Sequence, residues 1–113
     1  MHELSIALII IDIAKAEAEK AKALVIKEIE MDIGSLAGIE FESLEFSFSA
    51  VTKNTGLEKT VFIINKIKAQ SECIDCHVLF DVQHLFDPCP SCKGLNTKLL
   101  KGKELKVKSL LIE

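Results

Sequence analysis

Four cysteines lie close together in the second half of the chain, in the segment CIDCHVLFDVQHLFDPCPSC. They form two C-x-x-C pairs, Cys73 with Cys76 and Cys89 with Cys92, and twelve residues separate the pairs. Two such pairs can bring four thiolates to one point, as tetrahedral zinc requires, with Zn–S distances of about 2.3 Å. A segment this short buries little apolar surface, so a bound metal would supply its folding energy. The spacing therefore predicts a structural zinc site.

Two other interpretations of these cysteines are weaker. A pair of disulfides would need an oxidising compartment, and the N-terminus does not resemble a secretory signal. A redox-active dithiol at CPSC would leave the first cysteine pair unexplained. His77 and His84 also lie within the segment, but four sulfurs already complete a zinc site, so we expect both histidines on the surface. Protonation of His77, which follows Cys76 directly, could still influence the metal site.

The first three residues, Met1, His2 and Glu3, offer a second set of metal ligands. The amine of Met1, the deprotonated amide of His2 and the His2 imidazole can enclose a divalent metal in fused chelate rings. The amide or the carboxylate of Glu3 can fill a fourth position. Nitrogen-rich, tetragonal coordination suits Ni(II) or Cu(II). Most chain termini are frayed and have no function. From these three residues alone, two interpretations therefore stay open: a metal site, or a terminus without a role.

The hydrophobic pattern predicts the elements that would position these ligands. Apolar residues recur at helical spacing over 4–24, among Ala, Glu and Lys, which are good helix formers. Ile9, Ile10 and Ile13 widen the apolar face, so we expect this helix to be well covered by other elements.

A second helix and three strands are predicted in the rest of the chain. The apolar residues of 41–55 share a helical face, although the alternation of Phe46 and Phe48 leaves a strand open there. Alternating or β-branched segments predict strands at 25–34, 59–69 and 104–113.

This order of elements favours an α+β fold, with a small sheet packed against two helices and an inserted zinc-ribbon-like module. We expect an α+β domain at 1–70, completed by a C-terminal strand at 103–113. The zinc-binding module would occupy 71–102.

The composition argues against several functions. Hydrophobic residues make up 49% of the chain, enough for a folded core. All 14 residues counted as Lys+Arg are lysines, and arginine, a common ligand of phosphates and guanine, is absent. Three aspartates and no lysine lie in 73–92, where thiolates would add further negative charge, so we expect no nucleic-acid binding. Without a glycine-rich phosphate loop or a nucleophile paired with a base, we also expect no enzyme.

The N-terminal region does not predict a membrane or export segment. No stretch approaches the ~20 apolar residues that cross a bilayer. The run IALIII at 6–11 follows Glu3 instead of a basic residue, and Asp12 interrupts it, which is the opposite of a secretory signal. We therefore expect a cytoplasmic protein with no membrane partner. Because His2 is a large second residue, we also expect Met1 to be retained with its amine free.

As a whole, the chain resembles the HypA family, nickel metallochaperones of [NiFe]-hydrogenase maturation. The resemblance runs through the opening MHELS, the stretch IGSLAGIEFESLEFSFSAVTKNT, the two C-x-x-C pairs and the closing GKELKVKSLLIE. It covers nearly the whole chain, and the opening and the cysteine pairs in this order are specific together. One departure is His77, since family members often have Gly or Ser at that position.

The resemblance implies a non-enzymatic carrier that delivers Ni²⁺ to the precursor of the hydrogenase large subunit, together with the GTPase HypB. In some organisms the family also supplies urease. Met1, His2 and Glu3 would form the nickel site of the first domain, and the four cysteines would hold structural Zn²⁺. Any GTP hydrolysis would come from the partner. Two rival functions are a zinc-ribbon adaptor that binds proteins without specific nickel, and a thiol oxidoreductase with reactive cysteines and no zinc.

Overall fold

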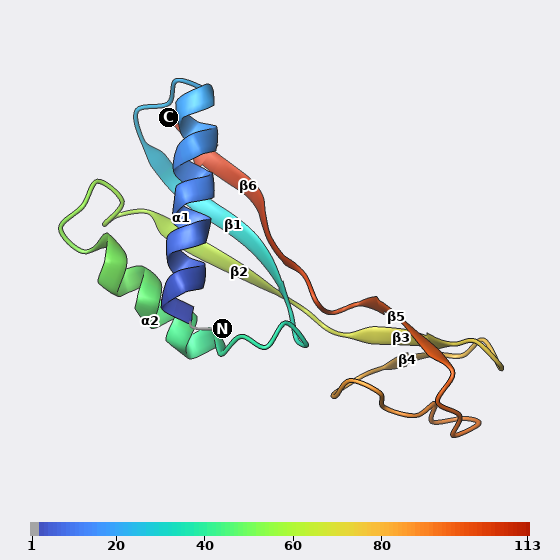
Figure 1. The fold of residues 1–113 in the computed structure, drawn as a ribbon. Coiled ribbons are helices and arrows are strands. Elements are labelled where there is room, and N and C mark those ends of the chain that lie inside the picture. The colour runs from blue at the N-terminus through green and yellow to red at the C-terminus, as the bar shows by residue number, and fades with distance from the viewer. Residues whose placement is uncertain (1–2) are drawn as a thin grey trace. The chain divides into compact units, whose positions relative to one another are not determined.

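The computed structural model describes residues 3–113 (Figure 1). The strands within these residues form two three-stranded sheets, ordered β2-β1-β6 and β4-β3-β5. This mixture of helices and small sheets confirms the predicted α+β class. In chain order the elements are α1 (Glu3–Lys20), β1 (Ile26–Gly34), α2 (Phe41–Thr52), β2 (Val61–Ile67), β3 (Gln70–Cys73), β4 (Leu79–Asp81), β5 (Thr97–Lys101) and β6 (Leu105–Ile112).

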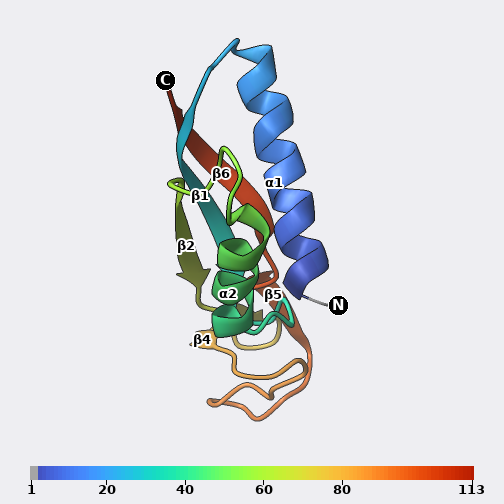
Figure 2. The same cartoon turned by 90° about the vertical axis from the view of Figure 1, so that its left-hand side faces the viewer.

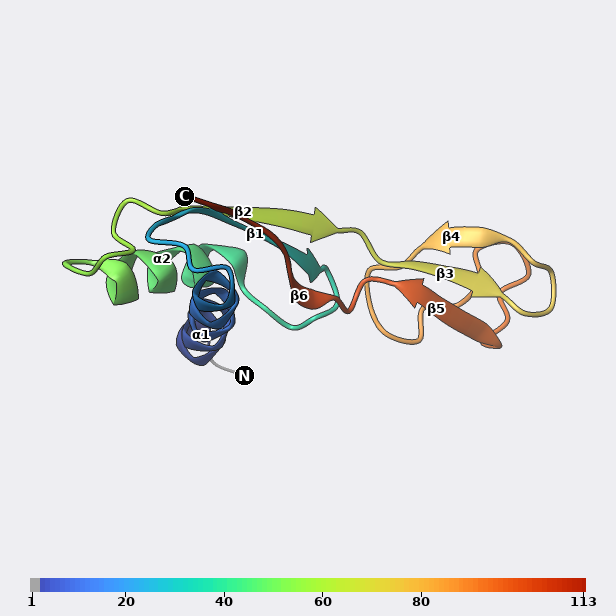
Figure 3. The same ribbon diagram turned by 90° about the horizontal axis from the view of Figure 1, so that it is seen from above.

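The first of two compact units comprises the residues up to Asp32, Gly38–Asn65 and Lys106–Glu113. In its sheet β1 is central, and α1 and α2 lie on the same face (Figure 2; Figure 3). β2 runs parallel to β1 because α2 connects them as a crossover, whereas β6 runs in the opposite direction (Figure 3). Reciprocal backbone hydrogen bonds of 2.9 and 3.1 Å between Val25 and Glu113 close the antiparallel pair.

The predicted alternation along β1 is confirmed in its central part. Ile29 and Met31 are fully buried, whereas Glu28 and Glu30 are only half-buried, so the apolar side of the strand faces the helices. On the other face, Asn65 of β2 and Ser109 of β6 donate hydrogen bonds of 2.7 and 3.1 Å to the Glu30 carboxylate. These two bonds hold the pKa of Glu30 below its ordinary value and join all three strands.

Helix α1 is less covered than the sequence suggested. Ile10 is buried, but Ile9 and Ile13 are about half exposed, at 54% and 45%. The expectation of a well-covered helix is therefore wrong, because α1 is an outer layer that has neighbours on one side only (Figure 2). The helix ends at Lys20, before the predicted end at 24.

The segment that could have been a helix or a strand is the helix α2. Glu40 is its N-cap, and the Glu40 carboxylate accepts a 2.9 Å hydrogen bond from the amide of Glu42. Phe48 is buried, whereas Phe46 is 73% exposed. Helical geometry thus separates two phenylalanines that alternate in the sequence, and the apparent strand pattern was misleading.

The second unit comprises Ile33–Ala37 and Lys66–Leu105. Its sheet is antiparallel, with β3 paired to β4 on one side and to β5 on the other. These three strands were not predicted, because segments of three to five residues are too short for a clear periodic pattern. The core of this unit is small: Ala69, Cys73, Phe80, Val82 and Cys89.

Two glycines allow the backbone segments of the second unit to approach closely. A Cβ on Gly34 would lie 2.0 Å from the carbonyl oxygen of Gly102, and one on Gly102 would lie 2.4 Å from the Cβ of Ala69. Gly102 also has a φ of +125°, which favours glycine. The Leu36 amide donates a 2.7 Å hydrogen bond to the Gly102 carbonyl and fixes this crossing.

None of the helices in residues 3–113 is long and apolar enough to span a membrane.

Candidate metal centres

The four cysteines converge on one point within the second unit. Cys73 ends β3 and Cys76 lies in the following turn, while Cys89 and Cys92 lie in the turn before β5. The four sulfurs all lie within 4.8 Å of one another. Two of the separations are 3.6 Å, between the Cys73 and Cys92 sulfurs, and 3.5 Å, between the Cys76 and Cys89 sulfurs. None of the four is in a disulfide.

The two C-x-x-C turns share the same backbone hydrogen bonds. In the first, the His77 amide donates to the Cys73 carbonyl at 2.8 Å, and the Cys73 amide donates to the Val78 carbonyl at 2.9 Å. In the second, Lys93 and Cys89 make the corresponding bonds, again at 2.8 and 2.9 Å. His77 and Lys93, which follow the second cysteine of each pair, have positive φ values of 62° and 61°. The turns are therefore equivalent knuckles that aim their sulfurs at a common point.

Positive φ explains why glycine suits the position of His77. A left-handed backbone is costly for most side chains and free of cost for glycine. At His77 the chain accepts this conformation because two backbone hydrogen bonds fix the knuckle.

The cysteine cluster has one buried side and one open side. Cys73 and Cys89 are fully buried in the apolar core of the unit, whereas Cys76 and Cys92 are exposed. The core thus anchors one cysteine of each knuckle, and the other cysteine of each pair lies on the exposed side of the cluster.

The sulfurs are close enough to influence one another's protonation. The Val78 amide lowers the pKa of Cys76, but desolvation and hydrogen bonds to the three neighbouring sulfurs outweigh it and raise that pKa to about 12. The Cys92 amide lowers the pKa of Cys89 to about 7, although burial opposes this effect. The Cys89 thiol is thus readily ionised, whereas the Cys76 thiol keeps its proton until a metal cation replaces it.

The donor set and its geometry fit zinc. Four thiolates about 2.3 Å from a tetrahedral ion would be about 3.8 Å apart. The separations of 3.5 and 3.6 Å are close to that distance, and they are far longer than the ~2.0 Å of a disulfide bond. The cluster therefore needs only a small rearrangement to hold the ion.

The histidines of the segment do not join the cluster, whose members are all cysteines. His77 is exposed, as expected, and so is His84, whose Nδ1 lies 3.8 Å from a carboxylate oxygen of Asp87. The Asp87 carboxylate accepts hydrogen bonds from the Gln83 and His84 amides, which hold its pKa below the ordinary value.

The predicted N-terminal site lies partly outside the described residues. Met1 and His2 are not described, and the described chain begins at Glu3, the first residue of α1. The Glu3 carboxylate accepts a 3.1 Å hydrogen bond from the backbone amide of Glu40, the N-cap of α2. The fold therefore holds the Glu3 side chain at the start of α2. No sequence signal predicted this contact, because 37 residues separate its partners.

A hollow of about 410 Å³ adjoins Glu3. Its other lining residues are Leu4 of α1 and Glu42, Ser43, Phe46 and Ser47 of α2. The N-terminal halves of the two helices thus form an open, partly acidic surface at the end of the chain that carries the expected nickel ligands.

Comparison with known proteins points to one family. Residues 1–112 match the family described as "Hydrogenase/urease nickel incorporation, metallochaperone, hypA". A hydrogenase maturation factor HypA of Parabacteroides distasonis is 42% identical over 113 residues, covering 100% of this chain and 98% of that protein. A protein of the same name from Geotalea daltonii is 38% identical over 112 residues, covering 99% of each chain.

Solved structures agree on the fold. The solution structure of the Ni metallochaperone HypA from Helicobacter pylori has a TM-score of 0.68 and 24% sequence identity, and it covers 99% of this chain and 97% of that one. A second solution structure of a HypA protein has a TM-score of 0.70 and 23% identity, with coverage of 100% and 97%.

Proposed function

The chain belongs to the HypA family of nickel metallochaperones for hydrogenase maturation, and on this premise we propose that it binds Ni(II) at its N-terminus and delivers it to the [NiFe]-hydrogenase large-subunit precursor. The observation that carries the proposal is the family match over 1–112, which includes both the opening residues and the cysteine knuckles. In this proposal the protein is a carrier and not an enzyme.

The nickel ligands would be Met1, His2 and Glu3. The Met1 amine, the His2 amide and the His2 imidazole supply three nitrogens in fused chelate rings, and the Glu3 amide or carboxylate supplies the fourth position. The hydrogen bond from the Glu40 amide to the Glu3 carboxylate supports a role for the folded helices, because it fixes one end of the chelating segment. A site with so few ligands anchored by the fold can release its metal to a partner.

The zinc ligands would be Cys73, Cys76, Cys89 and Cys92. Zinc in a closed four-sulfur site supplies folding energy and no reactive position. The module 71–102 would then hold zinc, while 1–70 with 103–113 forms the nickel-binding domain. The convergence of the four sulfurs supports this assignment.

The partners in this proposal are the GTPase HypB, the hydrogenase precursor and, in a urease-producing cell, the urease maturation proteins. We place the exchange in the cytoplasm, with neither nucleic acid nor membrane involved. Since the carrier has no phosphate-binding loop of its own, HypB would supply the nucleotide hydrolysis.

The alternative function is a zinc-ribbon adaptor that binds proteins but not nickel. Exposed apolar side chains in the second unit favour it, among them Phe86 at 87% and Leu95 at 73% exposure. Such an adaptor would contain one zinc and show no specific nickel binding.

Calorimetric titration of Ni(II) into zinc-loaded His2→Ala protein separates the two functions. The carrier proposal predicts that nickel binding is lost while the zinc content and the fold stay unchanged. The matched control is His84→Ala, which removes an exposed imidazole far along the sequence from the N-terminus and should keep full nickel affinity. Full affinity in the His2→Ala variant would refute the nickel-site assignment.

A further inference from the structure

Strand β2 forms one edge of the sheet β2-β1-β6. In Figure 3 it is the outermost strand of this sheet, with β1 on its inner side. One side of the β2 backbone is therefore paired with β1, while no strand within residues 3–113 pairs with the other side. An edge of this kind presents backbone N–H and C=O groups that can bind another extended chain.

The side chains of β2 do not protect this edge. The strand reads VFIINKI, with a single lysine near its end, and every residue in it is at least partly exposed. The opposite edge, β6, carries Lys106 and Lys108, and the edge strand β5 of the second sheet carries Lys98 and Lys101. The edge strand β4 has only three residues. Lysines and short strands commonly protect sheet edges from pairing, so β2 differs from the other three edges.

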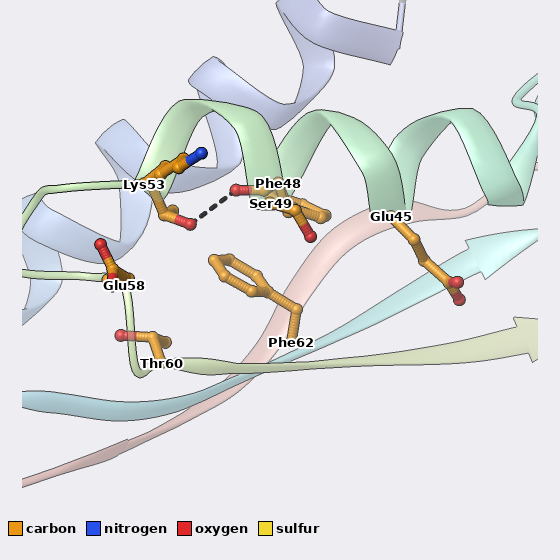
Figure 4. A pocket seen from close by; sticks show the side chains of 8 residues that line it. Glu45, Phe48, Ser49, Lys53, Glu58, Thr60 and Phe62 are labelled. Atoms are coloured by element: carbon orange, nitrogen blue, oxygen red, sulfur yellow. Dashed lines mark hydrogen bonds between the residues drawn. The ribbon is translucent and has the colours of Figure 1, made fainter.

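A hollow of about 450 Å³ lies between α2 and the start of β2 (Figure 4). Phe62 points from β2 toward α2, and its ring stacks on that of the buried Phe48, with centroids 4.1 Å apart and an interplanar angle of 18°. No residue of β1 or α1 lines the hollow, so it opens on the outer side of β2 and leaves room there for the side chains of an added strand. The lining residues are Glu45, Phe48, Ser49, Thr52, Lys53, Glu58, Thr60 and Phe62.

A second copy of the chain does not fit this edge. Two β2 strands paired about a two-fold axis would be about 4.8 Å apart, and both copies of α2 would lie on the same face of the joined sheet. Since Phe48 and Phe62 pack α2 over its own β2, the two helices would be separated by little more than the two strands. Packed helices need about 8–10 Å. The occupant is therefore an extended segment that carries no helix on this face.

The charges that line the hollow select the side chains of such a segment. Glu45 and Glu58 lie on opposite sides of the Phe62 ring, so each carboxylate can pair with its own basic side chain (Figure 4). Alternate residues of a strand point to the same face, and residues i and i+4 are about 13 Å apart. Basic residues at i and i+4 would thus reach the two ends of the hollow, with an aliphatic residue at i+2 over Phe62.

We propose that the β2 edge binds an extended segment of a partner protein as an additional strand, with this basic-x-aliphatic-x-basic pattern facing the hollow. Backbone hydrogen bonds to β2 supply affinity, and the alternate side chains supply specificity. Residues i+1 and i+3 lie on the opposite face of the sheet, beside Val61 and Ile63, where β-branched side chains pack well. This binding is independent of nickel and zinc, because no metal ligand lines the hollow.

The probe is the peptide acetyl-Thr-Lys-Thr-Val-Thr-Lys-Thr-amide, titrated into ¹⁵N-labelled, zinc-loaded protein and followed by two-dimensional NMR. Saturable shifts are expected in the amides of β2 and of the α2 residues that line the hollow. Two N-methylated peptides are the controls, one methylated at the Lys and Val amides and the other at the Thr amides. Because the amides of alternate residues point to the same side of a strand, one of these peptides should bind like the parent and the other should not bind.

Two pairs of variants locate the segment. Ser49→Leu fills the hollow and should weaken peptide binding at least about fivefold, whereas Ala50→Leu, the next residue of α2 but not part of the lining, should not. Glu45→Gln should weaken binding by about 1.5- to fivefold, the value of an exposed ion pair. Asp12→Asn, on the exposed surface of α1, should leave it unchanged.

Three results would overturn the proposal. Equal binding of both N-methylated peptides would mean attraction by charge without strand pairing. Shifts without saturation would mean that the edge has no specific site. Shifts of β2 amides that depend on protein concentration in the absence of peptide would assign the edge to a second copy.

Discussion

Replacing Gly102 with alanine should destabilise the cysteine-bearing unit by about 2–6 kcal/mol. The new Cβ would lie 2.4 Å from the Cβ of Ala69 and 2.5 Å from its Cα, so backbone atoms must shift. Overpacking of this kind costs about 1–3 kcal/mol. The φ of +125° adds about 1–3 kcal/mol, because an L side chain rarely adopts it. Since Ala69 belongs to the same small core as Cys73 and Cys89, the disturbance reaches the residues that position the sulfurs.

Urea unfolding of the zinc-loaded protein, followed by the NMR signals of amides in each unit, measures this loss. Two glycines provide matched controls, each read from the signals of its own unit. Gly38→Ala has a φ of +77° but open space around the new Cβ, so it should cost only about 1–2 kcal/mol. Gly56→Ala has open space and no positive φ, so it should change the free energy of unfolding by less than about 1 kcal/mol.

The relative losses in the free energy of unfolding of the three variants test whether the close crossing at Gly102 is a steric constraint. Steric overlap with Ala69 predicts that Gly102→Ala is clearly worse than Gly38→Ala. If the two variants lose the same free energy of unfolding, backbone conformation alone explains the effect and the close crossing is not a constraint.

Three further predictions follow from the same geometry. Met31→Ala should lower the free energy of unfolding of the first unit by about 2–5 kcal/mol in a urea titration, because this side chain is fully buried. Zinc binding at pH 7 should release at least about one proton and tighten from about pH 6 to about pH 8, because Cys76 has a pKa of about 12 and Cys89 of about 7. Calorimetry in two buffers of different ionisation enthalpy measures this release, and identical heats would contradict it. Glu3→Ala should weaken nickel binding by at least about tenfold, since it removes the acceptor for the Glu40 amide, and an unchanged affinity would exclude that role.

Long periodic segments were predictable from the sequence. The alternation of Ile29 and Met31 identified β1, and the doubled C-x-x-C spacing identified the cysteine cluster, because both patterns are local consequences of chain geometry. The family resemblance, which rests on the same local motifs, is also confirmed.

Features that depend on distant contacts were not predictable. The apolar pattern could not show that Ile9 and Ile13 face outward, because their exposure depends on where the other elements pack. The contact between Glu3 and Glu40 and the stacking of Phe48 on Phe62 both join residues far apart in the sequence. The strands β3, β4 and β5 were not predicted, because segments this short show no clear alternation of apolar and polar residues.

The central claim is that the opening residues hold nickel, and one calorimetric comparison tests it most directly. Ni(II) is titrated into two samples of known zinc content, one with the native N-terminus and one with a single extra residue before Met1. The carrier account predicts tight binding of one nickel by the native form only, because the extra residue displaces the amine from the chelate. Equal binding by both forms, or binding by neither, would contradict it.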